Sequence, residues 1–141
     1  MTPRINFVTL GVADIARSRG FYERLGLKAS SASNEGIAFF DVNGVVLALF
    51  GHEALADDAH IEAIPAPAYR GAGVAWNANS EAEADQIFAH AIACGATSIK
   101  IPEKVFWGGY SGYFADPDNH LWEVAYNPFF PISSEGRVQL P

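Results

Sequence analysis

Residues 113–124 read YFADPDNHLWEV, an aromatic pair followed by an acidic turn and an apolar strand. Residues 38–49, AFFDVNGVVLAL, show the same order at a constant offset of 75 residues. Each stretch is typical of a β-hairpin, and Asn43-Gly44 is the strongest short hairpin signal in the chain. Two copies of one supersecondary unit, each too small to bury its own apolar face, indicate two modules packed in one fold. A generic α+β domain with two similar hairpins is the alternative.

The segments before the first hairpin predict a strand and a helix. Residues 6–12 alternate in the pattern of a strand, and residues 15–25 place their apolar side chains on one side of a helix. Asp14 is a typical helix N-cap, and Gly26 stands where a left-handed residue commonly ends a helix. The hairpin then completes the first module.

The same order of elements precedes the second hairpin. Residues 73–78 predict a strand, and residues 80–83, SEAE, form a capping box that begins a helix. Gly95 ends this helix, and residues 97–101 return as a strand. The fold class is therefore α+β, with two tandem βαβββ modules. The expected boundaries are 4–52 for module one, 53–70 for a connecting loop with room for a short helix, 71–127 for module two and 128–141 for a C-terminal tail.

The composition limits the classes of function. Half of the 141 residues are apolar, which suits one domain with a sizeable core. The formal net charge of −7 would repel phosphate backbones and anionic lipids, so no nucleic-acid or membrane partner is expected. The N-terminus lacks a signal-peptide pattern, and the longest strongly apolar stretch, residues 45–50, is too short to span a bilayer, which favours the cytoplasm. Cys94 has no internal disulfide partner and is interpreted as a small buried residue.

Both ends of the repeated pattern carry a family resemblance. Residues 8–18, VTLGVADIARS, lead to Phe21-Tyr22 and to Leu25-Gly26-Leu27. This opening, together with residues 114–124, resembles the vicinal oxygen chelate superfamily of glyoxalases, extradiol dioxygenases and bleomycin-resistance proteins. The resemblance implies a curved mixed sheet that bears a cleft, with the helices on the outside. It also implies a homodimer, because many two-module members pair.

In the metal-dependent members of that superfamily, His, Gln or Glu side chains from the first and last strands of each module bind a divalent ion. Alignment by motif places Phe7 and Ala48 at these positions in module one, and Gly73 and Glu123 in module two. Only Glu123 has a donor atom, whereas such an ion needs about three or four protein donors. No cofactor is therefore expected and a divalent metal is disfavoured.

The resemblance also predicts which residues face the cleft. The strand neighbours on the same sides as the four aligned positions are Thr9, Phe50, Ala75 and Asn77. Trp107 and Tyr110 lie on a glycine-bearing stretch, where their rings either stack on a planar ligand or only seal the core or a dimer interface. The candidate ligand-binding residues are Phe7, Thr9, Ala48, Phe50, Gly73, Asn77, Trp107 and Tyr110.

Three functions remain open at this point. The leading hypothesis is a metal-independent, bleomycin-resistance-like protein that binds an apolar or aromatic small molecule. The second is an enzyme, either a lyase or isomerase with Glu123 as the catalytic general base, or a dioxygenase or glyoxalase relative with a relocated metal site. The third is a subunit or scaffold whose cleft is merely filled core, in which Glu123 is held by Asn77 or a backbone donor.

Overall fold

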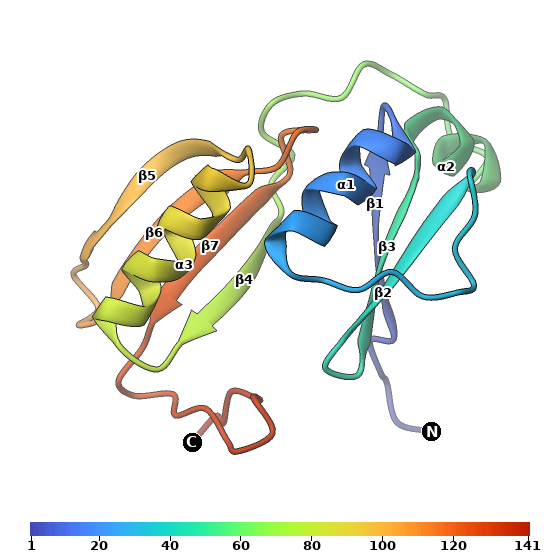
Figure 1. Cartoon of the computed structure of the whole chain (residues 1–141). Helices are drawn as coiled ribbons and strands as arrows, with labels where there is room; N and C mark the ends of the chain where they lie inside the picture. The colour runs from blue at the N-terminus through green and yellow to red at the C-terminus, as the bar shows by residue number, and fades with distance from the viewer. The chain divides into compact units, whose positions relative to one another are not determined.

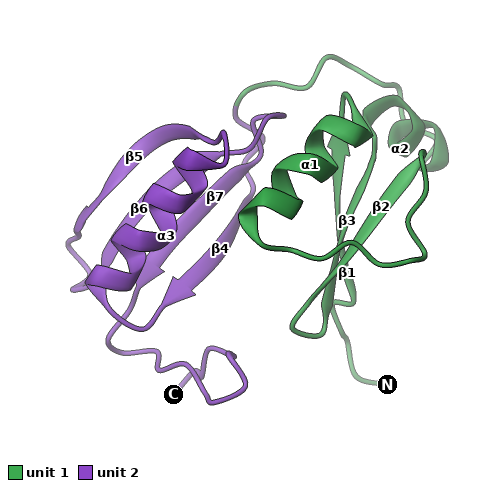
Figure 2. Ribbon diagram, viewed as in Figure 1, with its two compact units in different colours: residues 1–68 green, residues 69–141 purple.

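The computed structural model describes residues 1 to 141, which form two compact units (Figures 1 and 2). Unit 1 is Met1–Ala68 and unit 2 is Tyr69–Pro141. Each unit contains one mixed β-sheet with a helix packed on one face. The predicted α+β class with two tandem modules is confirmed. None of the helices has the length and apolar character needed to cross a bilayer.

Unit 1 is built on a three-stranded sheet. Its elements are β1 (Phe7–Val12), α1 (Ile15–Leu25), β2 (Ile37–Val42), β3 (Val45–Gly51) and α2 (His52–Asp58). The strand order is β1-β3-β2, with β1 parallel and β2 antiparallel to β3. A complete βαβββ module has one more strand between α1 and β2, and unit 1 has only an isolated bridge between Ala29 and Phe40 in its place. The short helix α2 lies at the start of the segment expected to connect the modules.

Local signals explain why unit 1 folds as the sequence predicts. The Asp14 carboxylate accepts a hydrogen bond from the Arg17 amide at 2.9 Å, which caps the first turn of α1. Gly26 ends α1 with φ of 116°, a left-handed conformation that glycine adopts without a steric cost. Asn43 and Gly44 both have positive φ, 55° and 90°, as a tight hairpin turn requires.

Unit 2 is built on a four-stranded sheet. Its elements are β4 (Gly73–Ala78), α3 (Glu81–Ala93), β5 (Thr97–Lys104), β6 (Tyr110–Ala115) and β7 (Leu121–Tyr126). The order is β4-β7-β6-β5, with β4 parallel to β7 and the other pairs antiparallel. β5 extends beyond its expected end at residue 101. Its pairing is irregular between Lys100 and Glu103, where Pro102 has no amide hydrogen to donate.

The start of α3 uses a variant of the predicted capping box. Ser80 Oγ accepts a hydrogen bond from the Glu83 amide at 3.1 Å, as expected. The Glu83 carboxylate does not return to Ser80 but accepts hydrogen bonds from the backbone and side-chain amides of Asn79. Two acidic residues in the first turn, Glu81 and Glu83, also suit the positive end of the helix dipole.

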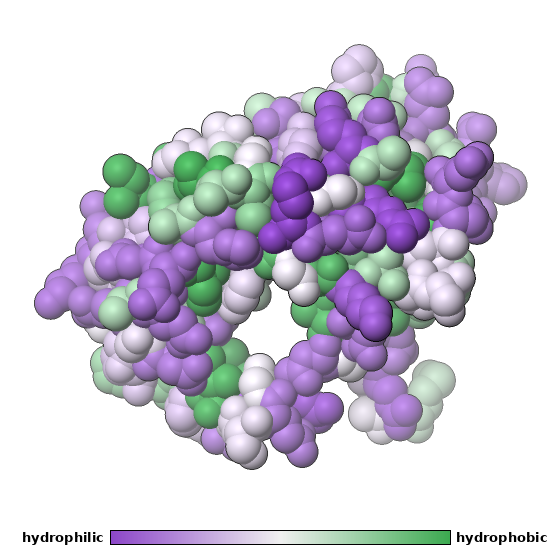
Figure 3. Space-filling view, viewed as in Figure 1, coloured by the Kyte–Doolittle hydropathy of each residue, from purple (hydrophilic) through white to green (hydrophobic).

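Aromatic side chains fill the space between each helix and its sheet. In unit 1, Phe21 and Tyr22 of α1 are fully buried, and the Tyr22 ring lies 6.0 Å from that of Phe40. In unit 2, the rings of Phe114 and Trp122 stack 5.9 Å apart under α3. Burial of each such side chain contributes roughly 1.5–3 kcal/mol to folding. The surface turned to the viewer in Figure 3 is mostly hydrophilic, in keeping with the net charge of −7.

The register of the two hairpins corrects the predicted repeat. Ala48 pairs with Phe39 in unit 1, and Glu123 pairs with Tyr113 in unit 2. Ala48 and Glu123 are 75 positions apart, as expected, but Phe39 and Tyr113 are only 74 apart. The constant offset is therefore wrong for the first strand of the hairpin. The chain between the two paired residues is one residue longer in unit 2 than in unit 1, so the first strands of the two hairpins align at an offset of 74 residues.

Candidate ligand-binding site in unit 2

Alternation along the strands of unit 2 separates a buried face from an open one. Phe114, Trp122 and Val124 are buried on the face that α3 covers. Their immediate neighbours along the strands, Tyr113 and Glu123, therefore lie on the opposite face, which we call the open face of unit 2. Helix α3 covers one face of the sheet, and the polar side chains of Tyr113 and Glu123 lie on the other face.

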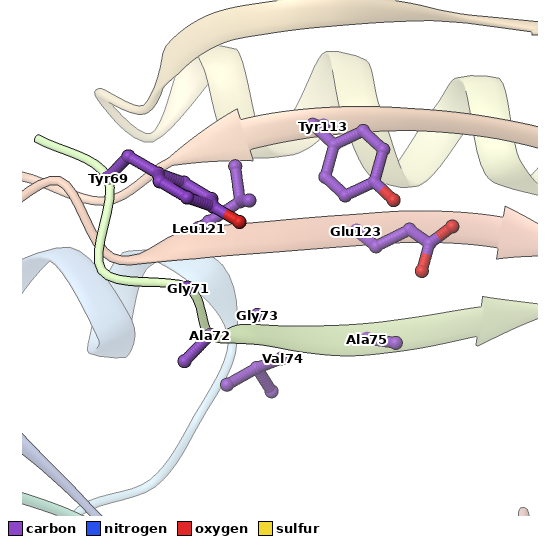
Figure 4. Close-up of a pocket in the computed structure, with 9 residues that line it drawn as sticks. All are labelled: Tyr69, Gly71, Ala72, Gly73, Val74, Ala75, Tyr113, Leu121 and Glu123. Carbon is purple, nitrogen blue, oxygen red and sulfur yellow. The ribbon is translucent and has the colours of Figure 1, made fainter.

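A pocket of about 220 Å³ lies on the open face, at the junction of β4, β6 and β7 (Figure 4). It is lined by Tyr69, Gly71, Ala72, Gly73, Val74, Ala75, Tyr113, Leu121 and Glu123. Gly73 leaves one side of the pocket open because it has no side chain. Tyr69 precedes β4 and presents its ring beside Leu121, while Tyr113 and Glu123 extend from neighbouring strands (Figure 4).

Tyr113 and Glu123 form the polar part of this pocket. They are direct cross-strand partners on β6 and β7, and the Tyr113 hydroxyl is directed toward the carboxylate (Figure 4). The pKa of Tyr113 is raised above its ordinary value, first by burial, then by the negative charge of Glu123 and by the hydrogen bond between the two side chains. Tyr113 therefore keeps its proton at neutral pH and donates it in a hydrogen bond to Glu123.

Glu123 forms no ion pair, because Lys100, which pairs with Tyr113 across the sheet on the same face, binds Glu103 instead. The ion pairs of unit 2 join Lys100 to Glu103 at 3.5 Å and Arg137 to Glu135 at 3.8 Å. On its other side, Glu123 pairs across the sheet with Ala75, which has no polar side chain. The carboxylate is only partly exposed, so its partner in the pocket is the Tyr113 hydroxyl.

Arg70 holds the segment that carries Tyr69. Its Nη2 donates to the backbone oxygen of Asp118 at 2.7 Å, and its Nη1 lies 2.6 and 3.1 Å from the two ring nitrogens of His120. The turn that receives Arg70 is itself fixed by Asp116, which is 2% exposed and accepts from the amides of Asp118 and His120 at 2.9 and 2.8 Å. The entrance to β4 is thus tied to the β6–β7 turn.

The residues predicted for the cleft in module one lie together on the open face of unit 1. Phe7 and Thr9 of β1 pair with Val46 and Ala48 of β3, and Phe50 follows on the same side of β3. The Phe7 ring contacts that of Phe39 edge to face, with centroids 6.2 Å apart. Ala48 is only 1% exposed despite its position on this face. These side chains form a largely apolar surface, in which the Thr9 hydroxyl is the polar group.

The residues predicted for module two are divided between the two faces. Gly73 and Glu123 line the pocket, and Asn77 lies further along the open side of β4 without lining it. Tyr110 donates a hydrogen bond at 2.8 Å to Asp85 of α3, so it belongs to the helix side of the sheet. Trp107 places its ring over Gly109 in the turn before β6. Neither Trp107 nor Tyr110 lines the pocket.

Sequence reasoning missed three residues that shape the site, Tyr69, Arg70 and Tyr113. Tyr113 carried a usable signal, because cross-strand pairing with the open-face residue Glu123 places both on one side. Tyr69 and Arg70 lie in the expected connecting loop, where no periodic pattern of apolar residues indicates which way a side chain faces. Their roles depend on contacts with residues about fifty positions away, such as the bond from Arg70 to His120.

The fold and this open-face site together define a glyoxalase-like, two-module protein. A family model described as the Glyoxalase/Bleomycin resistance protein/Dioxygenase superfamily matches residues 4–124, and the chain belongs to this superfamily. A glyoxalase-related enzyme from Fulvimarina pelagi is 31% identical, with 99% of each chain covered and a TM-score of 0.89. A glyoxalase/bleomycin resistance protein/dioxygenase from Nocardioides is 28% identical over 89% of this chain and 84% of that one, with a TM-score of 0.76.

A third solved structure supports the fold alone. Lactoylglutathione lyase from Agrobacterium tumefaciens is 22% identical, with 90% of this chain and 96% of that one covered and a TM-score of 0.68. No curated protein sequence matches the chain significantly.

The side chains of this chain do not fit the divalent metal expected from the superfamily. The aligned positions Phe7, Ala48 and Gly73 offer no oxygen, nitrogen or sulfur donor from a side chain, which leaves Glu123 alone. No group of three or more His, Cys, Asp and Glu side chains lies close enough together to bind a metal ion anywhere in the chain. One carboxylate does not replace the hydration shell of a divalent ion.

Proposed function

We propose that this protein binds a small organic molecule in the pocket of unit 2, without the divalent metal used by other members of its superfamily. The observation that carries the proposal is the chemistry of the pocket. Tyr69, which is 76% exposed, and the half-buried Tyr113 and Glu123 line a space of about 220 Å³ at the position where the superfamily would place a metal ligand. Apolar walls with a few convergent polar groups are typical of small-molecule sites.

The volume of the pocket limits the ligand. Drug-sized ligands occupy clefts of about 300–1,000 Å³, so the pocket in unit 2 suits a smaller molecule or one group of a larger one. The open side at Gly73 admits the ligand, while the bond between Tyr113 and Glu123 gives it a fixed polar partner.

The test is a ligand screen of the full chain after treatment with a chelator, read by ¹H–¹⁵N NMR spectra. Compounds that bind are expected to shift the amide signals of Gly71, Gly73 and Ala75 in saturable fashion, with no change on addition of Ni²⁺, Zn²⁺, Fe²⁺ or Mn²⁺. Elemental mass spectrometry of the untreated protein is expected to find no stoichiometric metal. About one divalent ion per chain, required for binding, would contradict the proposal.

An enzymatic role is the second candidate, because Glu123 and Tyr113 form a carboxylate–phenol pair in one pocket. In this candidate Glu123 removes a proton from a carbon next to a carbonyl group, and Tyr113 returns a proton to the product. The Fulvimarina pelagi structure described as a glyoxalase-related enzyme gives this candidate further support. Deuterium uptake from solvent into a bound carbonyl compound, abolished by Glu123→Gln, would favour the enzyme over the binding protein.

We further propose that the chain works in the cytoplasm as a homodimer. Two observations support this: its single cysteine, Cys94, is buried and has no second cysteine with which to form a disulfide within the chain, and the edge strand β5 exposes large apolar side chains at Ile99 and Ile101. Light scattering after size exclusion is expected to give twice the chain mass of 15.2 kDa. Ile101→Lys is expected to shift the protein toward the monomer, and a monomeric wild type would contradict the proposal.

A further inference from the structure

We propose that the pocket of unit 2 selects an organic cation, and specifically an alkylated ammonium group. This inference rests on the proposed function, because it names the class of ligand for the same pocket. It comes from three features of the pocket that are independent of one another: an uncompensated carboxylate, two tyrosine rings and an apolar floor without hydrogen-bond donors.

The carboxylate of Glu123 provides the charge that a cation needs. It pairs across the sheet with Tyr113 on one side and Ala75 on the other, and it takes part in none of the ion pairs of unit 2. Arg70 is a basic residue that lies between the pocket-lining residues Tyr69 and Gly71 in the chain. Its guanidinium is held by Asp118 and His120 at the β6–β7 turn and so does not neutralise Glu123. A ligand cation can therefore provide the missing positive charge.

The two tyrosines provide aromatic faces for the same cation. Figure 4 shows Tyr69 on one side of Leu121 and Tyr113 on the other, with Glu123 beyond Tyr113. Burial and the neighbouring carboxylate keep Tyr113 protonated, so its ring stays neutral and electron-rich on its face. Aromatic rings that surround a quaternary ammonium group attract it electrostatically and contact its methyl groups at the same time.

The remaining walls explain why an alkylated ammonium fits better than other charged groups. Leu121, Ala75 and Gly73 offer methyl contacts and open space, and their side chains carry no donor that could bind a phosphate or a carboxylate. An anion would also meet the charge of Glu123 and the net charge of −7. The alkyl groups of such a cation also contact the apolar side chains of Leu121 and Ala75, which the N–H groups of an unmethylated ammonium cannot use.

The test compares two probes of the same shape on the full chain. Choline carries a trimethylammonium group, and 3,3-dimethylbutan-1-ol carries an uncharged tert-butyl group in its place. Both are titrated by ¹H–¹⁵N NMR at constant ionic strength, with Gly71, Gly73 and Ala75 as reporters of the pocket. Choline is expected to bind at least about tenfold more tightly than the neutral alcohol, since cation–π contacts and the carboxylate act on the charged probe alone.

Substitutions separate charge at the pocket from charge elsewhere. Glu123→Gln is expected to weaken choline binding at least about tenfold and to leave the affinity for the alcohol nearly unchanged. Glu53→Gln on α2 removes the same charge from an exposed residue of unit 1 and serves as the matched control, with no expected effect beyond weak screening. Tyr113→Leu removes the aromatic face and is expected to lose more affinity than Tyr113→Phe, which keeps the ring.

Each outcome bears on one of the two proposals. Equal affinity for both probes, or choline binding that is insensitive to Glu123→Gln, would overturn the selection of a cation while leaving the pocket as a binding site. Neutral fragments that shift the reporter signals in the absence of any choline effect would do the same. If no compound in a broad library shifts these signals, the proposed function fails together with the inference drawn from it.

Discussion

The open faces of the two units are built on equivalent strands, and three of the positions at which they differ decide whether a pocket forms. Register places Phe7, Phe39 and Ala48 of unit 1 at the positions that Gly73, Tyr113 and Glu123 occupy in unit 2. In unit 1 the two phenylalanine rings meet edge to face and Ala48 beside them is buried. In unit 2 the same positions give a pocket with a phenol and a carboxylate.

This difference shows how a repeated fold acquires one specialised site. The glycine on the first strand removes the side chain that would fill the face, and the longer side chains on the hairpin bring polar atoms into the space. The helix-covered faces do not differ in this way, because both are packed with buried aromatic residues such as Phe40 and Phe114. Specialisation is thus confined to the face that does not carry the folding core.

The largest loss of stability is expected from substitutions in the helix-covered faces, which are alike in the two units. Phe40→Ala and Phe114→Ala each remove a fully buried ring from beneath a helix, and each is expected to lower the free energy of unfolding by about 3–5 kcal/mol. Chemical denaturation followed by circular dichroism measures this loss. Phe7→Ala on the open face of unit 1 is the control and should cost much less, because its side chain is 56% exposed. Equal losses for all three would contradict the division into two faces.

A single substitution should convert the open face of unit 2 into that of unit 1. Gly73→Phe places the equivalent of Phe7 over the pocket and is expected to weaken ligand binding by more than about 30-fold, or about 2 kcal/mol. The fold should tolerate it, because an added Cβ would meet only ordinary contacts, Leu121 O at 3.7 Å and Leu121 Cδ2 at 3.9 Å. NMR titration with a pocket ligand measures the affinity.

The matched control for that substitution is Gly73→Ala, whose methyl group leaves most of the pocket open. It should retain binding within a few-fold of the wild type. If Gly73→Phe binds as well as Gly73→Ala, the ligand lies elsewhere in the chain.

Most of the fold could be predicted because its signals are local. Asp14, Gly26 and Asn43-Gly44 each fix the chain within three or four residues of themselves, and the structure contains the cap, the left-handed end and the turn. The missing strand of unit 1 could not be predicted in this way. Whether residues near Ala29 form a ladder or a single bridge depends on pairing with β2, which lies about ten positions further along.

Less of the site could be predicted, because it depends on direction and on distant contacts. Alignment by motif with the superfamily placed Gly73 and Glu123 in the cleft, and both line the pocket. Composition alone suggested Trp107 and Tyr110, but aromatic residues serve a core or turn as readily as a ligand, and the hydroxyl of Tyr110 bonds to Asp85 on α3. The role of Arg70 depends on a turn 48 residues later, which no local pattern indicates.

Arg70 offers a smaller test of the same comparison, since it ties the entrance of β4 to the β6–β7 turn in unit 2. Arg70→Met keeps the length of the side chain but loses the bonds to Asp118 and His120. The segment that carries Tyr69 should become more mobile, and pocket affinity should fall by about three- to tenfold through the added cost of ordering. NMR relaxation and titration measure both effects. Arg137→Met, which removes the same charge from an exposed ion pair in the tail, should change neither.

The smallest effect concerns the proton on Tyr113, and it tests whether the polar pair in unit 2 acts as a pair. Glu123→Gln should lower the pKa of Tyr113 without restoring its ordinary value, because burial is the largest cause of the rise and remains in the variant. Asp85→Asn should return Tyr110 further toward its ordinary value, because there the hydrogen bond to Asp85 is the largest cause. A tyrosine ¹³Cζ NMR titration follows both groups.

Since the pKa of Tyr113 is higher in the folded than in the unfolded chain, its stabilising contribution is complete below the unfolded value and is lost as the pH rises through the folded value. Glu123→Gln should reduce that alkaline loss of stability. An unchanged pKa of Tyr113 in this variant would mean that the carboxylate and the phenol do not interact, and the pocket would then lack the polar pair that distinguishes unit 2 from unit 1.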